Sequence, residues 1–256
     1  MNELYRMTTV EAAEALGIAR IAVLPTGSLE QHGPHLPLGT DSLVADALSR
    51  RVAEELGEDA VLCPLIPIGM SEHHLEFSGT LTVRADTYLG LIDDVLESLH
   101  HHGIRRVLIV NGHGGNIDAL RLAARQARRD RRMLIASTMW SVTAADVASE
   151  IATSETYGHA CEVETSLMLS LSPDLVDMSA AEEVVGQPST LDPMIAPPRA
   201  RVDEPTWASE WSSSGALGEP NTADAEAGAA VVEAYVERVV QFARRMLERG
   251  LPEDDA

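Results

Sequence analysis

Positive charge is scarce in this sequence of 256 residues. It has 19 Lys and Arg residues against 40 Asp and Glu residues, a formal net charge of −21. Nucleic acids and anionic membrane surfaces attract basic proteins, so this balance argues against either of them as the main partner. We therefore expect a small-molecule partner, and we expect most of the acidic side chains to serve solubility.

Cysteines and long apolar runs are also lacking. Cys63 and Cys161 are too few for a disulfide framework or a zinc ribbon. No stretch of about 18 apolar residues is present, and the first residues lack the apolar core of a signal peptide. These absences predict a soluble, cytoplasmic protein with reduced thiols. Hydrophobic residues make up 45% of the chain, which is enough to bury a substantial core.

Apolar runs alternate with segments of helical periodicity along the chain. Strands are expected at 21–24, 60–68, 106–110 and 133–139, and helices at 10–17, 41–56, 87–102, 117–129, 143–152 and 222–247. Such alternation is typical of an α/β domain built on a parallel sheet. We predict one domain over residues 1–256, a three-layer sandwich around a mostly parallel sheet. A long surface excursion is expected at about 187–218.

The segment 27–41, GSLEQHGPHLPLGTD, carries the strongest chemical signal. It follows the short strand expected at 21–24 and contains Glu30, His32, His35 and Asp41 together with glycines and prolines. Acids and imidazoles in such a loop are poorly explained by a core or by solubility. They are well explained as metal ligands.

The spacing within this loop favours a single cluster. Glu30 and His32 are two residues apart, so in an extended segment both project to one side, and Gln31 is expected to point away. Asp41 begins the next expected helix. A simple role as N-cap residue is the alternative for Asp41, because Asp is common at that position.

Two later segments offer further ligands. The third expected strand runs into residues 111–116, with His113 at the centre of a glycine-rich turn, and phosphate binding is the alternative there. His159 and Glu164 open an apolar helix, and helical geometry points Glu162 elsewhere. Both acids could instead complement the helix N-terminus. Because parallel strands end at a common edge, these loops can converge with the first.

The combined ligand set holds two imidazoles and three carboxylates: Glu30, His32, Asp41, His113 and Glu164. This mixture suits Zn²⁺, Mn²⁺ or Fe²⁺. Five ligands exceed what one catalytic ion usually takes, and they suit two divalent ions about 3.5–4 Å apart with a bridging carboxylate. Such a pair activates water and polarises a carbonyl, the chemistry of amide hydrolysis. His159 is the candidate acid or base that passes a proton to the leaving nitrogen.

Over about residues 20–170 the sequence resembles the creatininase (creatinine amidohydrolase) family. The matching motifs occur in the family's order: 25–37 with Asp41, His74 with 77–80, 111–116, and 158–160 with 164–166. The resemblance implies a single-domain α/β fold, a binuclear metal centre, hydrolysis of a C–N bond and a homo-oligomer, with a hexamer favoured. By motif position, four residues match metal ligands of the family: Glu30, His32, Asp41 and His113. Asp41 matches the bridging ligand, and His159 matches the catalytic histidine of the family. Four more are expected to contact the substrate: Ser71, His74, Gly115 and Trp140.

Three departures separate the chain from creatininases. Gly115 stands where they carry a metal-binding glutamate, and we propose Glu164 as the replacement. Residues 155–158 contain no counterpart of their substrate-covering tryptophan, and Ser78 replaces a usual proline. This version of the motifs resembles other branches, including formamide deformylases, peptidases of the mycofactocin precursor and hydrolases of oxidised inositol rings.

We therefore expect a metal-dependent hydrolase that cleaves a C–N bond in a small cyclic amide or formamide. One alternative is a peptidase acting on a biosynthetic precursor peptide of the mycofactocin type, with the excursion at 187–218 covering the peptide. Another is a hydrolase of an oxidised cyclitol ring. A non-catalytic module that binds a metabolite or phosphate at 112–116 is the last alternative, and it predicts no stoichiometric transition metal.

Overall fold

A parallel β-sheet forms the centre of the protein. The computed structural model describes residues 1–154, 157–184, 191–192, 194–195, 202 and 204–252. In these residues five strands form one sheet in the order β1-β3-β2-β4-β5: β1 (Asn2–Glu3), β2 (Ile21–Thr26), β3 (Ala60–Leu62), β4 (Arg106–Asn111) and β5 (Leu134–Thr138). All neighbouring strands are parallel, which confirms the predicted α/β class.

The two central strands bring the important loops to one edge. All of β2 is buried, and so is β4 apart from its first residue. A continuous apolar run is what a strand covered on both faces requires. Thr26 pairs with Asn111 at the carboxyl ends of these strands. The loops that follow β2 and β4 therefore begin side by side.

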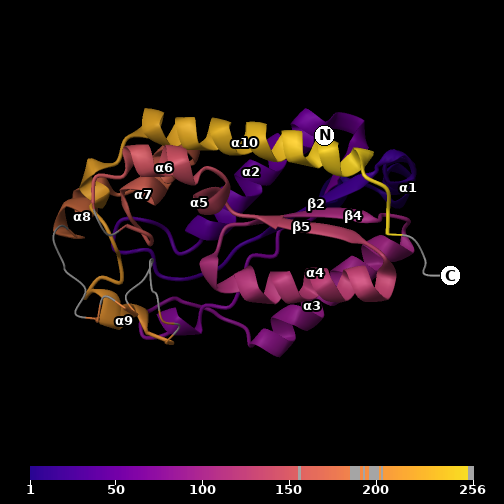
Figure 1. The fold of residues 1–256 in the computed structure, drawn as a ribbon. Helices are drawn as coiled ribbons and strands as arrows, with labels where there is room; N and C mark the ends of the chain where they lie inside the picture. Colours follow the sequence, from indigo (N-terminus) through magenta and orange to yellow (C-terminus); the bar gives the residue numbers. More distant parts are fainter. Residues whose placement is uncertain (155–156, 185–190, 193, 196–201, 203, 253–256) are drawn as a thin grey trace.

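Helices cover both faces of the sheet (Figure 1). One layer contains α2 (Thr40–Leu56), α5 (Trp140–Thr143), α6 (Ala145–Ile151), α7 (Glu162–Leu171) and α10 (Ala225–Glu248), and the other contains α3 (Ala85–His101) and α4 (Ile117–Arg131). Ile21 and Val23 belong to the hydrophobic cluster of the first layer, whereas Ala22 and Leu24 belong to that of the second. This alternation in β2 is the two-residue period of a strand between two layers.

Three further helices are present among the described residues. They are α1 (Thr9–Ile18), α8 (Met178–Ala181) and α9 (Ala208–Trp211), with several single turns of 3₁₀ helix. The prolonged strand expected at 60–68 is wrong, because β3 ends at Leu62. Pro64 and Pro67 cannot donate to a strand ladder, and only an isolated bridge from Thr26 to Ile66 continues the pairing.

The helix expected at 143–152 corresponds to α6, and the short α5 precedes it as a separate helix. Ala144 lies between them with φ −115° and ψ 29°, which is outside the helical region. The β1 strand was not expected, because two residues are too short for a periodic signal. Among the described residues, none of the helices combines the length and the apolar character that a membrane crossing needs.

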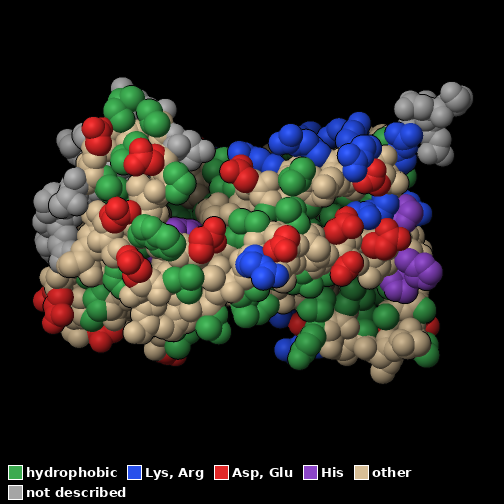
Figure 2. All heavy atoms as spheres, turned by 90° about the horizontal axis from the view of Figure 1, so that it is seen from below, with side chains coloured by type: hydrophobic (Ala, Val, Ile, Leu, Met, Phe, Trp, Pro, Cys, Tyr) green, Lys and Arg blue, Asp and Glu red, His purple; other side chains and the backbone are tan. Residues whose placement is uncertain are grey.

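Charge is unevenly distributed over the surface. Figure 2 shows basic side chains gathered along the edge formed by α4, where Arg121, Arg125, Arg128 and Arg129 are exposed. Arg128 and Arg129 lie in the last turn of α4, where cations complement the helix dipole. These exposed arginines of α4 are thus explained in part by the helix dipole, although the chain is acidic overall.

Candidate metal centre

The five ligands expected from the sequence meet at the carboxyl edge of the sheet. Glu30 and His32 lie in the loop after β2, and His113 follows β4. Asp41 lies in the first turn of α2 and Glu164 in the first turn of α7. All five side chains are buried, with at most 4% of each residue exposed. Burial of so many ionisable groups is costly unless they are paired or bind a cation.

The ligand atoms form two groups that share one residue. Glu30, Asp41 and His113 each offer an atom within 4.8 Å of the others, and so do His32, Asp41 and Glu164. Asp41 is the residue common to both groups.

Backbone carbonyl groups fix which imidazole nitrogen faces the cluster. His32 Nδ1 donates to the Glu30 carbonyl oxygen at 3.1 Å, and its Nε2 lies 3.3 Å from Asp41 Oδ1. His113 Nε2 donates to the Met70 carbonyl oxygen at 3.0 Å, and its Nδ1 lies 3.1 Å from Asp41 Oδ2. Histidines that bind metal are usually oriented in this way through their other nitrogen.

The Glu30 carboxylate is held on both oxygens. Ser28 Oγ donates to Oε2 at 2.9 Å, and His74 Nε2 lies 3.3 Å from Oε1. Ser71 Oγ contacts the Ser28 hydroxyl and lies 3.2 Å from His113 Nε2. Ser71, expected to contact the substrate, is fully buried and is not among the residues that line the cavity described below.

The first turn of α7 separates its two glutamates. Glu164 Oε2 accepts a hydrogen bond from the Ala160 amide at 2.7 Å and lies 3.7 Å from His32 Nε2. Glu162 Oε1 instead accepts from the Ser154 amide at 2.9 Å. The helix thus directs Glu162 away from the cluster, as its geometry predicts.

The pKa values of the buried groups show that the cluster favours bound protons or other cations. Burial alone would lower the pKa of His32, but the carboxylates of Asp41 and Glu164 outweigh it and raise that pKa to about 10. Burial raises the pKa of Glu164 to about 7, although His32 opposes the shift. When no other cation is bound, the buried carboxylates of Glu30, Asp41 and Glu164 thus favour protonation of the groups beside them.

Two unsatisfied atoms test whether a metal fits. Among the described residues, the buried atoms His32 Nε2 and Asp41 Oδ2 make no hydrogen bond of good geometry, although ionisable neighbours lie 3.3 and 3.1 Å away. Buried polar atoms are normally satisfied. An imidazole nitrogen and a carboxylate oxygen left in this way, within a mixed N/O donor set, suit a divalent cation such as Zn²⁺, Mn²⁺ or Fe²⁺.

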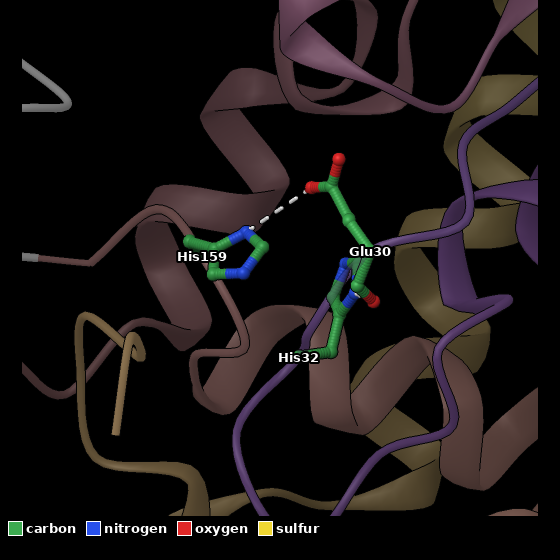
Figure 3. Close-up of side chains that lie close together, drawn as sticks. All are labelled: Glu30, His32 and His159. Atoms are coloured by element: carbon green, nitrogen blue, oxygen red, sulfur yellow. Dashed lines mark hydrogen bonds and ion pairs between the residues drawn. The ribbon is translucent and has the colours of Figure 1, made fainter. Parts of the chain in front are cut away.

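His159 lies beside Glu30 and His32 (Figure 3). Its Nδ1 is 3.8 Å from Glu30 Oε1, and its Nε2 donates to the Gln31 carbonyl oxygen at 2.8 Å. With Glu30 and His32 it forms a third group of ligand-capable atoms. Burial lowers the pKa of His159 to about 3, so the ring is neutral at pH 7 and its Nδ1 lone pair faces Glu30.

The side chain of Gln31 lies outside the ligand groups and contacts two imidazole rings that border them. Its Nε2 lies 2.9 Å from His74 Nδ1 and 3.0 Å from His159 Nε2, and it donates to the Gly215 carbonyl oxygen at 3.3 Å. Its Oε1 accepts from the Gly33 amide at 2.9 Å. Gly33 has φ +64°, so the chain turns directly after this segment.

The glycines after β4 allow close approach between loops. A Cβ on Gly112 would lie 2.1 Å from the Asp41 carbonyl oxygen, and one on Gly115 would lie 2.3 Å from the Met70 carbonyl oxygen. In this arrangement Gly115 leaves no room for a glutamate, whereas Glu164 supplies a carboxylate from the other side. The glycines therefore have a packing reason apart from phosphate binding.

A cavity of about 190 Å³ opens onto the cluster. Its lining includes four of the ligands: Glu30, Asp41, His113 and Glu164. Other parts of the lining come from His73, Met139, Trp211 and Leu217. The cavity thus combines acidic and imidazole groups with apolar and aromatic side chains, as binding sites for small molecules commonly do.

Two of the expected substrate contacts, His74 and Gly115, line this cavity. Trp140 is not among the lining residues: its side chain is buried in the hydrophobic core, and Met139 lines the cavity. His35 also lies outside the cluster, with Nε2 2.9 Å from Thr165 Oγ1.

Some of the expected features lie outside the described residues. They are residues 155–156 before His159 and, within the excursion, residues 187–190, 193, 196–201 and 203.

Four lining side chains were not expected from the sequence: His73, Met139, Trp211 and Leu217. The doublet His73-His74 and the pair Met139-Trp140 offered a choice between neighbours that only the backbone geometry decides. Trp211 lies in the excursion, which has no periodicity that would place it. Its only signal was the presence of a large aromatic residue in a polar loop.

Comparison with known proteins agrees with the resemblance found in the sequence. The family model described as creatininase, creatinine amidohydrolase, matches residues 5–243. The chain belongs to the creatininase family. This confirms the resemblance, the fold and the expected enzyme class of amidohydrolases.

Relatives within the creatininase family differ in what they act on. The mycofactocin precursor peptide peptidase of Mycolicibacterium smegmatis is 35% identical over 81% of this chain and 78% of its own length. The creatinine amidohydrolase of Pseudomonas putida is 30% identical over 88% of each chain. A solved structure described as "Creatininase Mn" has a TM-score of 0.81 at 27% identity and covers 96% of this chain and 99% of its own.

Proposed function

We propose that this creatininase-family protein is a metal-dependent hydrolase that cleaves a C–N bond in a small cyclic amide or formamide. The observation that carries the proposal is the overlap of two buried ligand groups at Asp41. A family that includes a creatinine amidohydrolase and a manganese form of creatininase supports it.

Each ligand group would hold one divalent cation. Glu30, Asp41 and His113 suit the first, and His32, Asp41 and Glu164 suit the second. A pair of such cations, when bound, lowers the pKa of a water molecule and polarises an amide carbonyl. The hydrogen bonds from His32 and His113 to backbone carbonyl groups keep their ligand nitrogens aimed at the cluster.

His159 would move the proton that hydrolysis requires. Its neutral ring can accept a proton at Nδ1 from the attacking water and return it to the leaving nitrogen. The bond from its Nε2 to the Gln31 carbonyl oxygen keeps the ring turned so that Nδ1 faces Glu30 Oε1.

Cavity size and lining favour a small, uncharged substrate. The volume of about 190 Å³ is below the range of roughly 300–1,000 Å³ for drug-sized ligands. None of the described residues that line the cavity is Lys or Arg. A carboxylate or phosphate on the substrate would therefore meet acidic groups in this lining without a cationic side chain to bind it.

A peptidase acting on a precursor peptide is the second candidate. The identity of 35% to the mycofactocin precursor peptide peptidase favours it. The same cluster could hydrolyse a peptide bond, because the attacking water and the leaving nitrogen have the same roles in both reactions.

Metal reconstitution followed by a substrate screen tests the proposal. The purified chain is stripped with a chelator, reloaded with Zn²⁺, Mn²⁺ or Fe²⁺, and assayed with lactams, cyclic ureas, formamides and short peptides. We expect turnover of small amides only in the reloaded protein. Cleavage of peptides alone would favour the second candidate, and equal turnover without metal would refute both.

A histidine variant tests the role of the proton carrier. His159→Gln should lower kcat by roughly 10²–10⁴-fold, the usual contribution of a general acid or base, while metal content stays the same. His101→Gln, at the exposed end of α3, is the control and should leave both unchanged. Loss of metal from His159→Gln would instead make His159 a ligand.

A further inference from the structure

Part of the cavity lining comes from a segment that is distant in sequence from the metal ligands. Trp211 ends α9, and its residue is only 8% exposed. Its ring centroid lies 5.3 Å from that of His74, at an interplanar angle of 89°, and 6.0 Å from that of His159, at 72°. It also lies 5.7 Å from His73. The indole thus packs against three imidazoles around the ligand cluster.

The indole and the loop after it are anchored to the site. Its Nε1 donates to Thr206 Oγ1 at 3.0 Å. Farther along, the Gly215 carbonyl oxygen accepts from Gln31 Nε2 at 3.3 Å. The Leu217 amide donates to the His159 carbonyl oxygen at 2.7 Å, within an isolated antiparallel bridge. These bonds connect α9 and its loop to the residues that orient His159.

The three tryptophans of the chain have different environments. Trp140 is buried in the core, and Trp207 is 45% exposed at the start of α9. Only Trp211 lines the cavity, where Met139 and Leu217 extend the apolar surface. An anchored aromatic ring beside polar groups can hold the flat, uncharged part of a ligand while the polar groups bind its reactive end.

We propose that Trp211 is a substrate-positioning residue whose indole forms an aromatic wall for the flat, uncharged part of an amide substrate. The carbonyl group of that substrate then faces the ligand cluster. This inference rests on the proposed function for the nature of the substrate, but binding alone can test it. Trp211 would therefore determine which amides fit, without holding a metal ion itself.

Two hydroxamates provide the test, because hydroxamates chelate divalent cations through the same pair of oxygens. Benzohydroxamate carries a flat phenyl ring and acetohydroxamate carries a methyl group. Their dissociation constants are measured by calorimetry on the manganese-loaded full chain and on three variants: Trp211→Ala, Trp211→Phe and, as the matched control from the same helix turn, Trp207→Ala. Metal content is measured on each protein.

Trp211→Ala should weaken benzohydroxamate by about tenfold or more, because the aromatic contact is lost. It should weaken the binding of acetohydroxamate by less than about threefold, because the methyl group buries less apolar area than a phenyl ring. Trp211→Phe should retain most of the affinity for benzohydroxamate, and Trp207→Ala should retain all of it.

Several outcomes would overturn the inference. An equal effect of Trp211→Ala on both hydroxamates, or loss of metal from that variant, would make Trp211 a structural support of the cluster. A wild-type chain that takes up no divalent cation would overturn both proposals. A chain that binds metal and shows the expected difference between hydroxamates, yet hydrolyses no amide, would overturn only the proposed function.

Discussion

The two ligand groups share Asp41 but balance their other carboxylates in different ways. Burial disfavours the charged form of both Glu30 and Glu164. For Glu30, the nearby His113 outweighs burial, so the pKa lies well below its ordinary value. For Glu164, burial prevails and raises the pKa to about 7. The first group is thus ionised by its own partners, whereas the second retains a carboxyl that needs a further cation.

This difference follows from where the two groups originate. Glu30 and His113 leave neighbouring central strands, and their side chains are held by Ser28 and by the Met70 carbonyl group. Glu164 comes from α7, and a single backbone amide, that of Ala160, supports its carboxylate. We therefore expect the first group to bind its ion more tightly than the second.

Removal of the shared carboxylate should have the largest effect. Asp41→Asn keeps the shape of the side chain but removes a charge from both groups. We expect loss of both ions and a fall in kcat beyond the roughly 10²–10³-fold cost of losing one charge-stabilising group. Elemental analysis and kinetics measure the two effects. Asp46→Asn, on the same helix and bonded to Arg50, is the control and should retain metal and activity.

Variants of the two glutamates in α7 distinguish the two ligand groups. Glu164→Gln should weaken the second ion by more than the roughly 10–100-fold cost of losing an outer contact, and leave the first ion bound. Glu162→Gln should leave both ions bound, because Glu162 bonds to backbone amides such as that of Ser154. Metal titration distinguishes these results. Equal loss of both ions from Glu164→Gln would show that the groups are not independent.

A smaller effect is expected where the loop after α9 contacts Gln31. Gly215 has φ +75°, and a Cβ there would lie 2.3 Å from Gln31 Nε2. Gly215→Ala should therefore lower kcat/KM by about tenfold, since strain of this kind costs about 1–3 kcal/mol, and leave both ions in place. Gly17→Ala, whose Cβ would meet no atom within 4 Å, is the matched control. Loss of metal from Gly215→Ala would extend the role of this loop to the ligands themselves.

The smallest effect concerns the metal-free protein. The pKa of His32 is raised from 6.5 to about 10, because Asp41 and Glu164 outweigh burial. A raised pKa contributes stability below pH 6.5, and this contribution disappears as the pH rises through 10. The Tm of the chelator-treated protein should therefore fall by a few degrees across this range. His32→Gln should show a smaller fall, and an equal fall would exclude His32 as the cause.

Much of the first group could be predicted from the sequence because it depends on local rules. Central strands read as apolar runs, their loops share an edge, and Glu30, Asp41 and His113 lie directly after strands or at a helix start. The preference for Glu164 over Glu162 needed only helical geometry.

The rest depends on contacts between distant segments. Alternation along the chain could not decide between Met139 and Trp140. Trp211 reaches the cavity only because its loop bonds to Gln31 and His159. Periodicity within the excursion contains no information about that docking.

Anomalous diffraction from crystals of the manganese-loaded protein tests the central claim most directly. We predict two metal peaks per chain on either side of the Asp41 carboxylate, one beside His113 Nδ1 and one beside His32 Nε2. After partial removal of metal, the peak beside His32 should weaken first. A single peak, or peaks that do not contact Asp41, would contradict the account.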